Sequence, residues 1–242
     1  MKKLFVFAVF AFIGYAFIVN QNFRNSAIEE FFNVKEKIDS TIGGGKTKTV
    51  SKTSKFDFEQ STKGHSDEAV AYFNEICYGS EFNNNGKIHK WSEDVKIYVA
   101  GDKKSYLIEE LNSIVYELNN IINPIDIKVV NNKADANYVI YLCSGDEYAS
   151  VESGVENLTL TNWGLFATRS RGETIISGTM YVDIYRCKSI SGQKHLLREE
   201  LTQSLGFMND SYSYPNSMFY QGWTETTSYA QIDIEIIDIL YN

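Results

Sequence analysis

REELTQSLGF, Arg198–Phe207, has the frame of a helix that holds a catalytic metal ion. Glu200 directly follows one ligand position, Glu199, and a second ligand position, Gln203, comes one helical turn later. Helices of this kind carry His at both ligand positions, because imidazole nitrogen binds zinc well. The stretch therefore indicates an enzyme with unusual ligands, a fold that has lost its metal, or an ordinary amphipathic helix.

The helix predicted over Gly192–Leu205 has one apolar face and one polar flank. At about 100° per residue, three leucines share the apolar face. Arg198 and Thr202 lie beyond that face and are expected to point to solvent. Glu200 and Gln203 lie between the core and solvent. A partly buried carboxylate is costly without a partner or a task, so Glu200 is a candidate either for a structural ion pair or for catalysis.

The length of 242 residues suits one domain and an appendage. Residues 1–22 hold two lysines followed by the apolar run Leu4–Val19, which predicts an uncleaved signal anchor or a cleaved signal peptide. Either one would place the rest of the chain outside the cytoplasm. Residues 23–63 predict a short amphipathic stalk helix and a flexible linker rich in Gly, Ser, Thr and Lys. The folded domain is therefore expected over residues 64–242.

Charge is unevenly distributed along the chain. Residues 1–63 hold 10 Lys/Arg and 6 Asp/Glu, so the remaining 179 residues hold 13 and 25 and carry a net charge of −12. An acidic domain without a basic stripe argues against nucleic acid as a partner. Cys77, Cys143 and Cys187 are too scattered for a disulfide scaffold. They fit either one disulfide and a free thiol or three small buried residues.

Helical and extended periodicities alternate through the predicted domain. Helices are predicted over Asp67–Cys77, Lys104–Ile121, Gly192–Leu205 and Thr227–Tyr241. Strands are predicted over Val95–Ala100, Ile125–Val130, Asn137–Leu142, Leu165–Arg169 and Thr174–Tyr185. This order predicts an α+β domain with a mixed sheet.

Three parts of the chain together carry a family resemblance. The run that starts at Glu199 resembles the metzincin signature HExxHxxGxxH, with Gly206 at the position of the Gly. YPNSMFY, Tyr214–Tyr220, resembles the Met-turn of the matrixin branch, with Met218 as its Met. TTSYAQIDIEIIDILYN, Thr226–Asn242, is similar to the last helix of matrixins. The resemblance implies a zincin-like catalytic-domain fold with a long helix, an active-site helix, a Met-turn and a C-terminal helix.

A narrower resemblance covers residues 66–242. AVAYFNEICYGSEF, IHKWSEDVKIYV and HLLREELTQSLGFMND are together similar to domain-of-unknown-function family 2927, a group with a metzincin-like layout. That family has no established activity or substrate. The resemblance therefore implies a fold and leaves the function open.

The resemblance also assigns roles to single residues. Glu200 matches the general base of metzincins. Glu199 and Gln203 match the first two metal ligands, and Asn209 matches the third. Zinc is the metal that the resemblance implies, but amide oxygens are weak zinc ligands and this set does not support it. His195, one turn before Glu199, is a further candidate that would hold a metal or share a proton with it.

Three functions follow as alternatives. The first is an exported metalloprotease-like hydrolase in which Glu200 activates water. The second is an inactive, metal-free relic that binds an extended peptide or a cell-envelope component along its edge strand. The third is assembly at the membrane through the stalk helix. Trp163 and Trp223 are interpreted as packing residues in preference to a specificity pocket.

Overall fold

The computed structural model of the protein describes residues 56–78 and 87–242. The signal segment, the stalk helix and most of the linker expected over residues 1–63 lie outside the described residues. Within the described ranges, no helix combines the length and the apolar character that a membrane crossing needs. The membrane anchor therefore stays a prediction from the sequence.

The packed unit begins earlier than residue 64, the expected start of the domain. A short helix, α2 (Phe58–Ser61), lies in the range expected to be linker. The rings of Phe56 and Phe58 lie 5.8 Å and 6.2 Å from the ring of Phe73 in the core. Polar residues surround these two aromatic residues in the sequence, so the composition of the segment hid their packing role.

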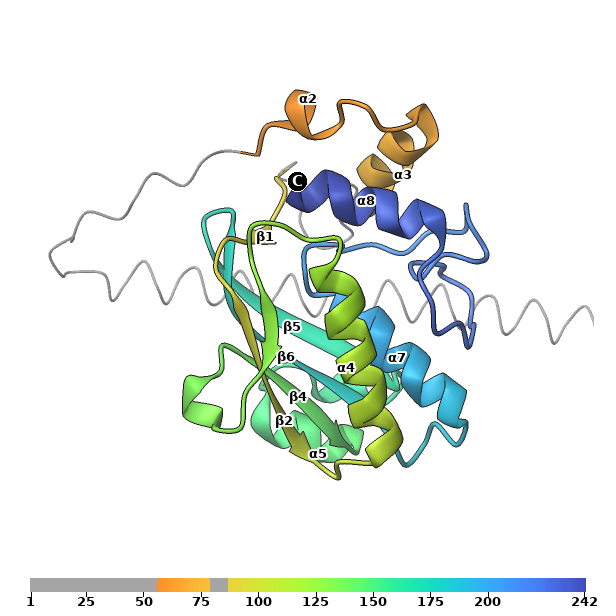
Figure 1. Ribbon diagram of the computed structural model, residues 1–242. Helices are drawn as coiled ribbons and strands as arrows, with labels where there is room; N and C mark the ends of the chain where they lie inside the picture. The colour runs from red at the N-terminus through yellow and green to blue at the C-terminus, as the bar shows by residue number, and fades with distance from the viewer. Residues whose placement is uncertain (1–55, 79–86) are drawn as a thin grey trace, which may run out of the picture. The chain divides into compact units, whose positions relative to one another are not determined.

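A six-stranded sheet occupies the centre of the described residues (Figure 1). Its strands are β1 (Lys90–Trp91), β2 (Val95–Gly101), β3 (Ile127–Val129), β4 (Tyr138–Cys143), β5 (Gly164–Arg171) and β6 (Thr174–Asp183). The order β1-β6-β4-β2-β3 is parallel throughout, and β5 pairs antiparallel with β6. The fold is thus α+β with a mostly parallel sheet, and β5 is an edge strand.

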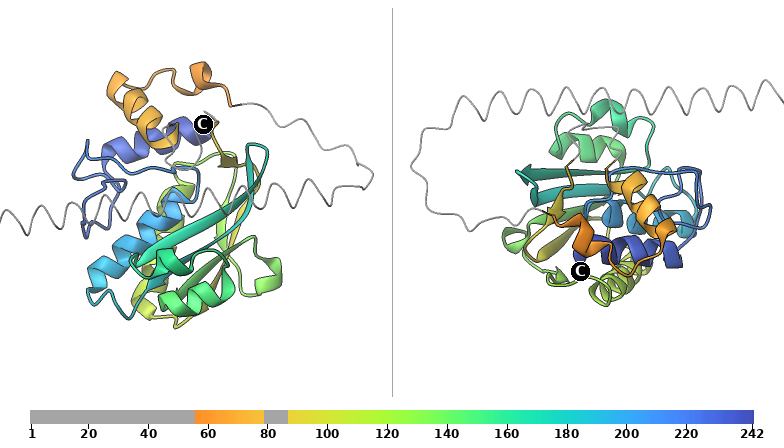
Figure 2. Two further views of the ribbon diagram at one scale, coloured as in Figure 1. Left: turned by 180° about the vertical axis from the view of Figure 1, so that it is seen from behind. Right: turned by 90° about the horizontal axis from the view of Figure 1, so that it is seen from above.

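Helices cover both faces of this sheet (Figure 2, right). They are α3 (Asp67–Cys77), α4 (Ser105–Asn119), α5 (Gly145–Val151), α6 (Glu156–Thr159), α7 (Ile190–Gln203) and α8 (Gln231–Tyr241). α5 and α6 lie on one face of the sheet, and α4 and α7 lie on the other. Tyr181 of β6 stacks on Tyr148 of α5, with ring centroids 4.6 Å apart. Met180 points to the opposite face and is fully buried.

The prediction that Arg198 and Thr202 face solvent is wrong. The Arg198 side chain is 1% exposed and lies between two glutamates of α4, with Nη2 2.7 Å from Glu110 Oε1 and Nη1 2.6 Å from Glu117 Oε2. Thr202 is also buried and shares a 2.8 Å hydrogen bond with the hydroxyl of Tyr229. A helical wheel describes one helix alone, and here a second helix packs on its polar side.

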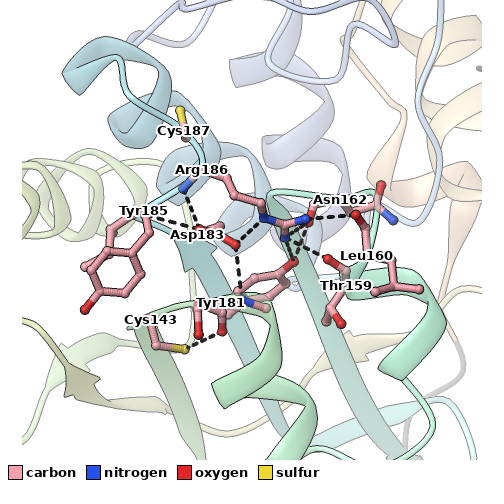
Figure 3. Close-up of polar contacts among 12 residues, drawn as sticks. Cys143, Thr159, Leu160, Asn162, Tyr181, Asp183, Tyr185, Arg186 and Cys187 are labelled. Carbon is pink, nitrogen blue, oxygen red and sulfur yellow. Dashed lines mark hydrogen bonds and ion pairs between the residues drawn. The ribbon is translucent and has the colours of Figure 1, made fainter.

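A buried carboxylate fixes the connection between β6 and α7 (Figure 3). Asp183 Oδ2 accepts hydrogen bonds from Arg186 Nε at 2.6 Å and from the backbone N–H of Gly145 at 3.1 Å. Its Oδ1 accepts from the backbone N–H groups of Tyr185 and Arg186. The Arg186 guanidinium donates in turn to the carbonyl of Asn162 at 2.8 Å. The cluster therefore joins the starts of α5 and β5 to the approach to α7.

Candidate functional site

Glu200 lies directly beneath the first residue of the edge strand. Its side chain is 5% exposed, and a Cβ atom placed on Gly164 would come within 2.7 Å of Glu200 Oε1. That distance is too short for a real contact, so a side chain at residue 164 would require Glu200 to move. Nothing in the sequence pointed to this glycine, because the two residues are 36 positions apart. The carboxylate predicted as a catalytic base is thus held at the edge of the sheet.

His195 and Glu199 are brought together as their spacing predicted. His195 Nε2 lies 3.5 Å from Glu199 Oε2 and 3.4 Å from the hydroxyl oxygen of Thr224. His195 Nδ1 lies 2.8 Å from the carbonyl oxygen of Thr226. A carbonyl only accepts, so Nδ1 carries the hydrogen and donates it. Burial lowers the pKa of His195, so the ring is neutral at neutral pH and its Nε2 is an acceptor facing the carboxylate.

Gln203 and Asn209, the second and third expected ligands, face different partners. Gln203 Nε2 donates to a carboxylate oxygen of Asp210. Asn209 Nδ2 donates to the carbonyls of Glu75 at 3.1 Å and Ile76 at 3.0 Å, near the end of α3. The residue beside Gln203 is therefore Asp210, one position after the residue that the metzincin frame assigned. The metzincin signature assigns ligands by residue position alone. The path of the turn after α7 determines which side chain faces Gln203.

The donor set does not fit zinc. A zinc site needs three or four nitrogen, sulfur or carboxylate ligands that converge on one point. In residues 56–78 and 87–242, no three His, Cys, Asp or Glu side chains form such a group. The amide nitrogens of Gln203 and Asn209 are hydrogen-bond donors here, and amide oxygens are weak zinc ligands. No catalytic step through a metal follows from this geometry.

Gly206 and Met218 have structural positions. Gly206 has a φ of +133°, and a Cβ atom there would lie 2.3 Å from the carbonyl oxygen of His89. Glycine is therefore needed both for the turn after α7 and for the close approach of a second chain segment. Met218 is fully buried, and its backbone N–H donates to Asp233 Oδ2 at 3.0 Å. This bond ties the turn around Met218 to α8.

The two tryptophans interpreted as packing residues of the core or of the Met-turn are both exposed, and Trp223 lies beside His195. Trp163 is 38% and Trp223 is 53% exposed, and their rings form a T-shaped pair with centroids 5.6 Å apart. The Trp223 ring also lies 6.2 Å from the His195 ring. Burial in the core is therefore wrong for this pair, although the two rings pack against each other and Trp223 packs beside His195.

The outer edge of β5 presents its backbone to a further strand. The backbone N–H of Asp183 donates to the carbonyl of Trp163. Every second residue counted from Trp163 along β5 therefore turns its N–H and C=O toward β6. In an antiparallel pair every second residue turns its N–H and C=O away from its partner. In β5 these residues are Gly164, Phe166 and Thr168. An unpaired strand edge of this kind can pair with a further strand by main-chain hydrogen bonding.

Comparisons with known proteins identify a family but no activity. Residues 66–242 match the family described as "Protein of unknown function (DUF2927)". No curated protein matches the chain. Among solved structures, "Crystal structure of myroilysin" is 11% identical, with a TM-score of 0.30, and the match covers 50% of this chain and 47% of that chain. A likeness this small bears on neither fold nor activity.

Proposed function

This chain belongs to the DUF2927 family, and from that premise we propose that it is a metal-independent, metzincin-like domain that binds an extended peptide along the outer edge of β5. The same proposal places the domain outside the cytoplasm, tethered to the membrane or released from it by its N-terminal segment. The partner is a peptide of the cell envelope or its surroundings.

The order and pairing of the elements support the metzincin-like layout. β2, α4, β3, β4, β5, β6 and α7 come in this order along the chain, with α5 and α6 between β4 and β5, and the antiparallel strand β5 lies at the edge beside α7. Gly206 follows α7 with a positive φ, and Met218, in the connection between α7 and α8, is buried. These are the features that the sequence resemblance implies.

One observation carries the metal-independent part of the proposal. The residues at two of the three ligand positions form hydrogen bonds within the chain, Gln203 with Asp210 and Asn209 with the end of α3. His195, the further candidate ligand, donates from Nδ1 to the carbonyl of Thr226. Its Nε2 lies 3.5 Å from Glu199 Oε2. Gln203, Asn209 and the Nδ1 side of His195 are thus held by hydrogen bonds within the chain in the place of a metal.

The first prediction concerns metal content. The purified protein should contain no stoichiometric zinc, and neither EDTA nor added zinc should change its melting temperature. A ligand of the native state at 100 times its Kd adds about 2.7 kcal/mol to the free energy of unfolding, so a real site would be obvious. Elemental analysis and calorimetry measure both quantities. A melting temperature that falls in EDTA and recovers with zinc would contradict the proposal.

A second prediction concerns the edge of β5. Peptides selected from a nine-residue library for binding to the wild-type protein should lose binding to a Thr168→Pro variant, because proline removes the outward N–H. The β5–β6 ladder does not use that N–H, so the melting temperature should change little. Thr168→Ala is the matched control, since it keeps the N–H and should keep the affinity.

Two results would count against the proposal. Unchanged affinity of Thr168→Pro, measured by fluorescence anisotropy, would place the peptide elsewhere. Hydrolysis of the bound peptide that disappears in Glu200→Gln would instead support the hydrolase, with Glu200 as its base. Glu200 lies beneath Gly164 whether the protein is a hydrolase or a binding domain. The Glu200→Gln variant therefore shows whether this carboxylate takes part in hydrolysis or only supports the strand.

A further inference from the structure

We propose that Trp163, Trp223 and Glu199 form a recognition site for a positively charged side chain, lysine or arginine, of the peptide that lies along β5. This inference rests on the proposed function, because it names the kind of residue that the peptide presents at one end of the strand. It assigns the exposed aromatic pair a role in specificity.

The aromatic pair has the geometry that a cation needs. The rings of Trp163 and Trp223 are perpendicular within 10° and 5.6 Å apart, so the face of one ring meets the edge of the other. Both side chains keep a large exposed fraction. Tryptophan is the strongest of the aromatic residues in binding a cation over its ring face. An aliphatic ligand would gain from the apolar area, but only a cation also gains from the charge distribution of the rings.

Acceptor atoms lie next to the same rings. His195 Nε2 and Glu199 Oε2 are 3.5 Å apart, and the His195 ring lies 6.2 Å from the Trp223 ring. The Glu199 side chain is 16% exposed, so a ligand can reach it. An ammonium group has three donors and no acceptor, so it can donate to both atoms at once. An anionic or purely acceptor ligand would be repelled here.

The surrounding charge favours the same class of ligand. Glu225, two residues after Trp223, is an exposed carboxylate whose Oε2 accepts from the Ser189 hydroxyl at 2.9 Å. Hydrogen bonds from Ser191 and Ser189 hold the pKa of Glu225 below its ordinary value, so it stays charged. Residues 64–242 carry a net charge of −12. A field of this sign attracts cationic peptides and disfavours acidic ones.

The location explains why one peptide residue is singled out. Trp163 directly precedes Gly164, the first residue of β5. A strand that pairs with the outer edge at Gly164, Phe166 and Thr168 therefore passes the aromatic pair at one end only. A single position of the peptide should carry the preference for a cation, and its neighbours should be tolerant.

The test compares peptides that differ in one charge. Each position of a selected peptide is made lysine or norleucine, and binding to the full-length protein in detergent is measured by fluorescence anisotropy. At one position lysine should bind about 2- to 30-fold more tightly than norleucine. Trp223→Leu keeps apolar area but removes the ring, so it should abolish the preference. Tyr116→Leu, an exposed aromatic of α4, should leave the preference unchanged.

The outcomes separate this inference from the function it rests on. Equal affinity for lysine and norleucine at every position would overturn the cation site while leaving the peptide edge intact. If no peptide binds, the proposed function fails. The cation site is then tested by adding tetramethylammonium chloride at matched ionic strength and measuring tryptophan fluorescence. Quenching in the wild type but not in Trp223→Leu supports the cation site. Quenching by N-acetylglucosamine oligomers alone would assign the pair to a glycan and overturn it.

Glu199→Gln provides a second variant in case Trp223→Leu does not fold. It keeps the shape of the side chain and removes its charge, so the preference for lysine should fall and norleucine should bind as before. The melting temperature of each variant shows whether it is folded. A folded Glu199→Gln variant that keeps the full preference for lysine would remove Glu199 from the site.

Discussion

Replacement of Asp183 by Ala should lower the free energy of unfolding by about 3–5 kcal/mol. The change removes a buried acceptor from three backbone N–H groups and from the Arg186 guanidinium. Arg186 would keep its bonds to carbonyls at the end of α6 but lose its counter-charge. Urea titration followed by circular dichroism measures the loss, and a loss below about 1 kcal/mol would show that water replaces the carboxylate.

The pH dependence provides an independent check on the same residue. Burial alone would raise the pKa of Asp183, but hydrogen bonds from the backbone and guanidinium of Arg186 outweigh it and hold the pKa below its ordinary value. A lowered pKa in the folded state contributes stability above the unfolded pKa of about 3.9, and this stability is lost as the pH falls further. The difference in the free energy of unfolding between the wild type and Asp183→Asn should therefore become smaller below about pH 4. Asp135→Ala, at an exposed site, is the control and should change stability by less than about 0.5 kcal/mol.

Arg198→Leu should cause a loss of similar size, about 3–5 kcal/mol, for a different reason. Arg198 neutralises Glu110, whose side chain is 8% exposed, and it stacks 4.8 Å from the centre of the Tyr229 ring. Without the guanidinium a carboxylate stays buried between α4 and α7. Lys194, at 3.6 Å from Glu110, compensates only in part.

A double variant separates the buried charge from the lost packing. Arg198→Leu combined with Glu110→Leu removes both charges and should be closer to the wild type than Arg198→Leu alone, because apolar replacement of a buried pair is often neutral. A double-mutant cycle in urea measures this coupling. A double variant less stable than the single one would mean that Glu110 has other partners that matter more.

The long elements of the fold could be predicted because each carries its own periodicity. α3 begins and ends where the sequence placed it, and α7 was predicted within about two residues at each end. β1 has two residues and no period to detect. α5 was missed although Ser144 and Glu147 have capping-box spacing and form that box in the structure. The polarity of this stretch suggests a loop, whereas the spacing of its Ser and Glu indicates the start of a helix.

The site could be predicted only where both partners lie on one helix. His195 and Glu199 are four residues apart, and helix geometry alone brings them together. Arg198 meets Glu110 across 88 residues, and Glu200 meets Gly164 across a strand and a helix. The family frame assigned Asn209 to the site, but the path of the turn after α7 brings Asp210 to Gln203. Contacts of this kind depend on the packing of elements, which no local pattern encodes.

The contact between Gly164 and Glu200 makes the two positions share one volume. The carboxylate fills the space that a side chain on the strand would take, so a larger residue at 164 would displace Glu200. A serine at 164 should therefore cost less stability beside an alanine at 200 than beside the glutamate. The effects of substitutions at the helix position and at the strand position are therefore expected to depend on each other.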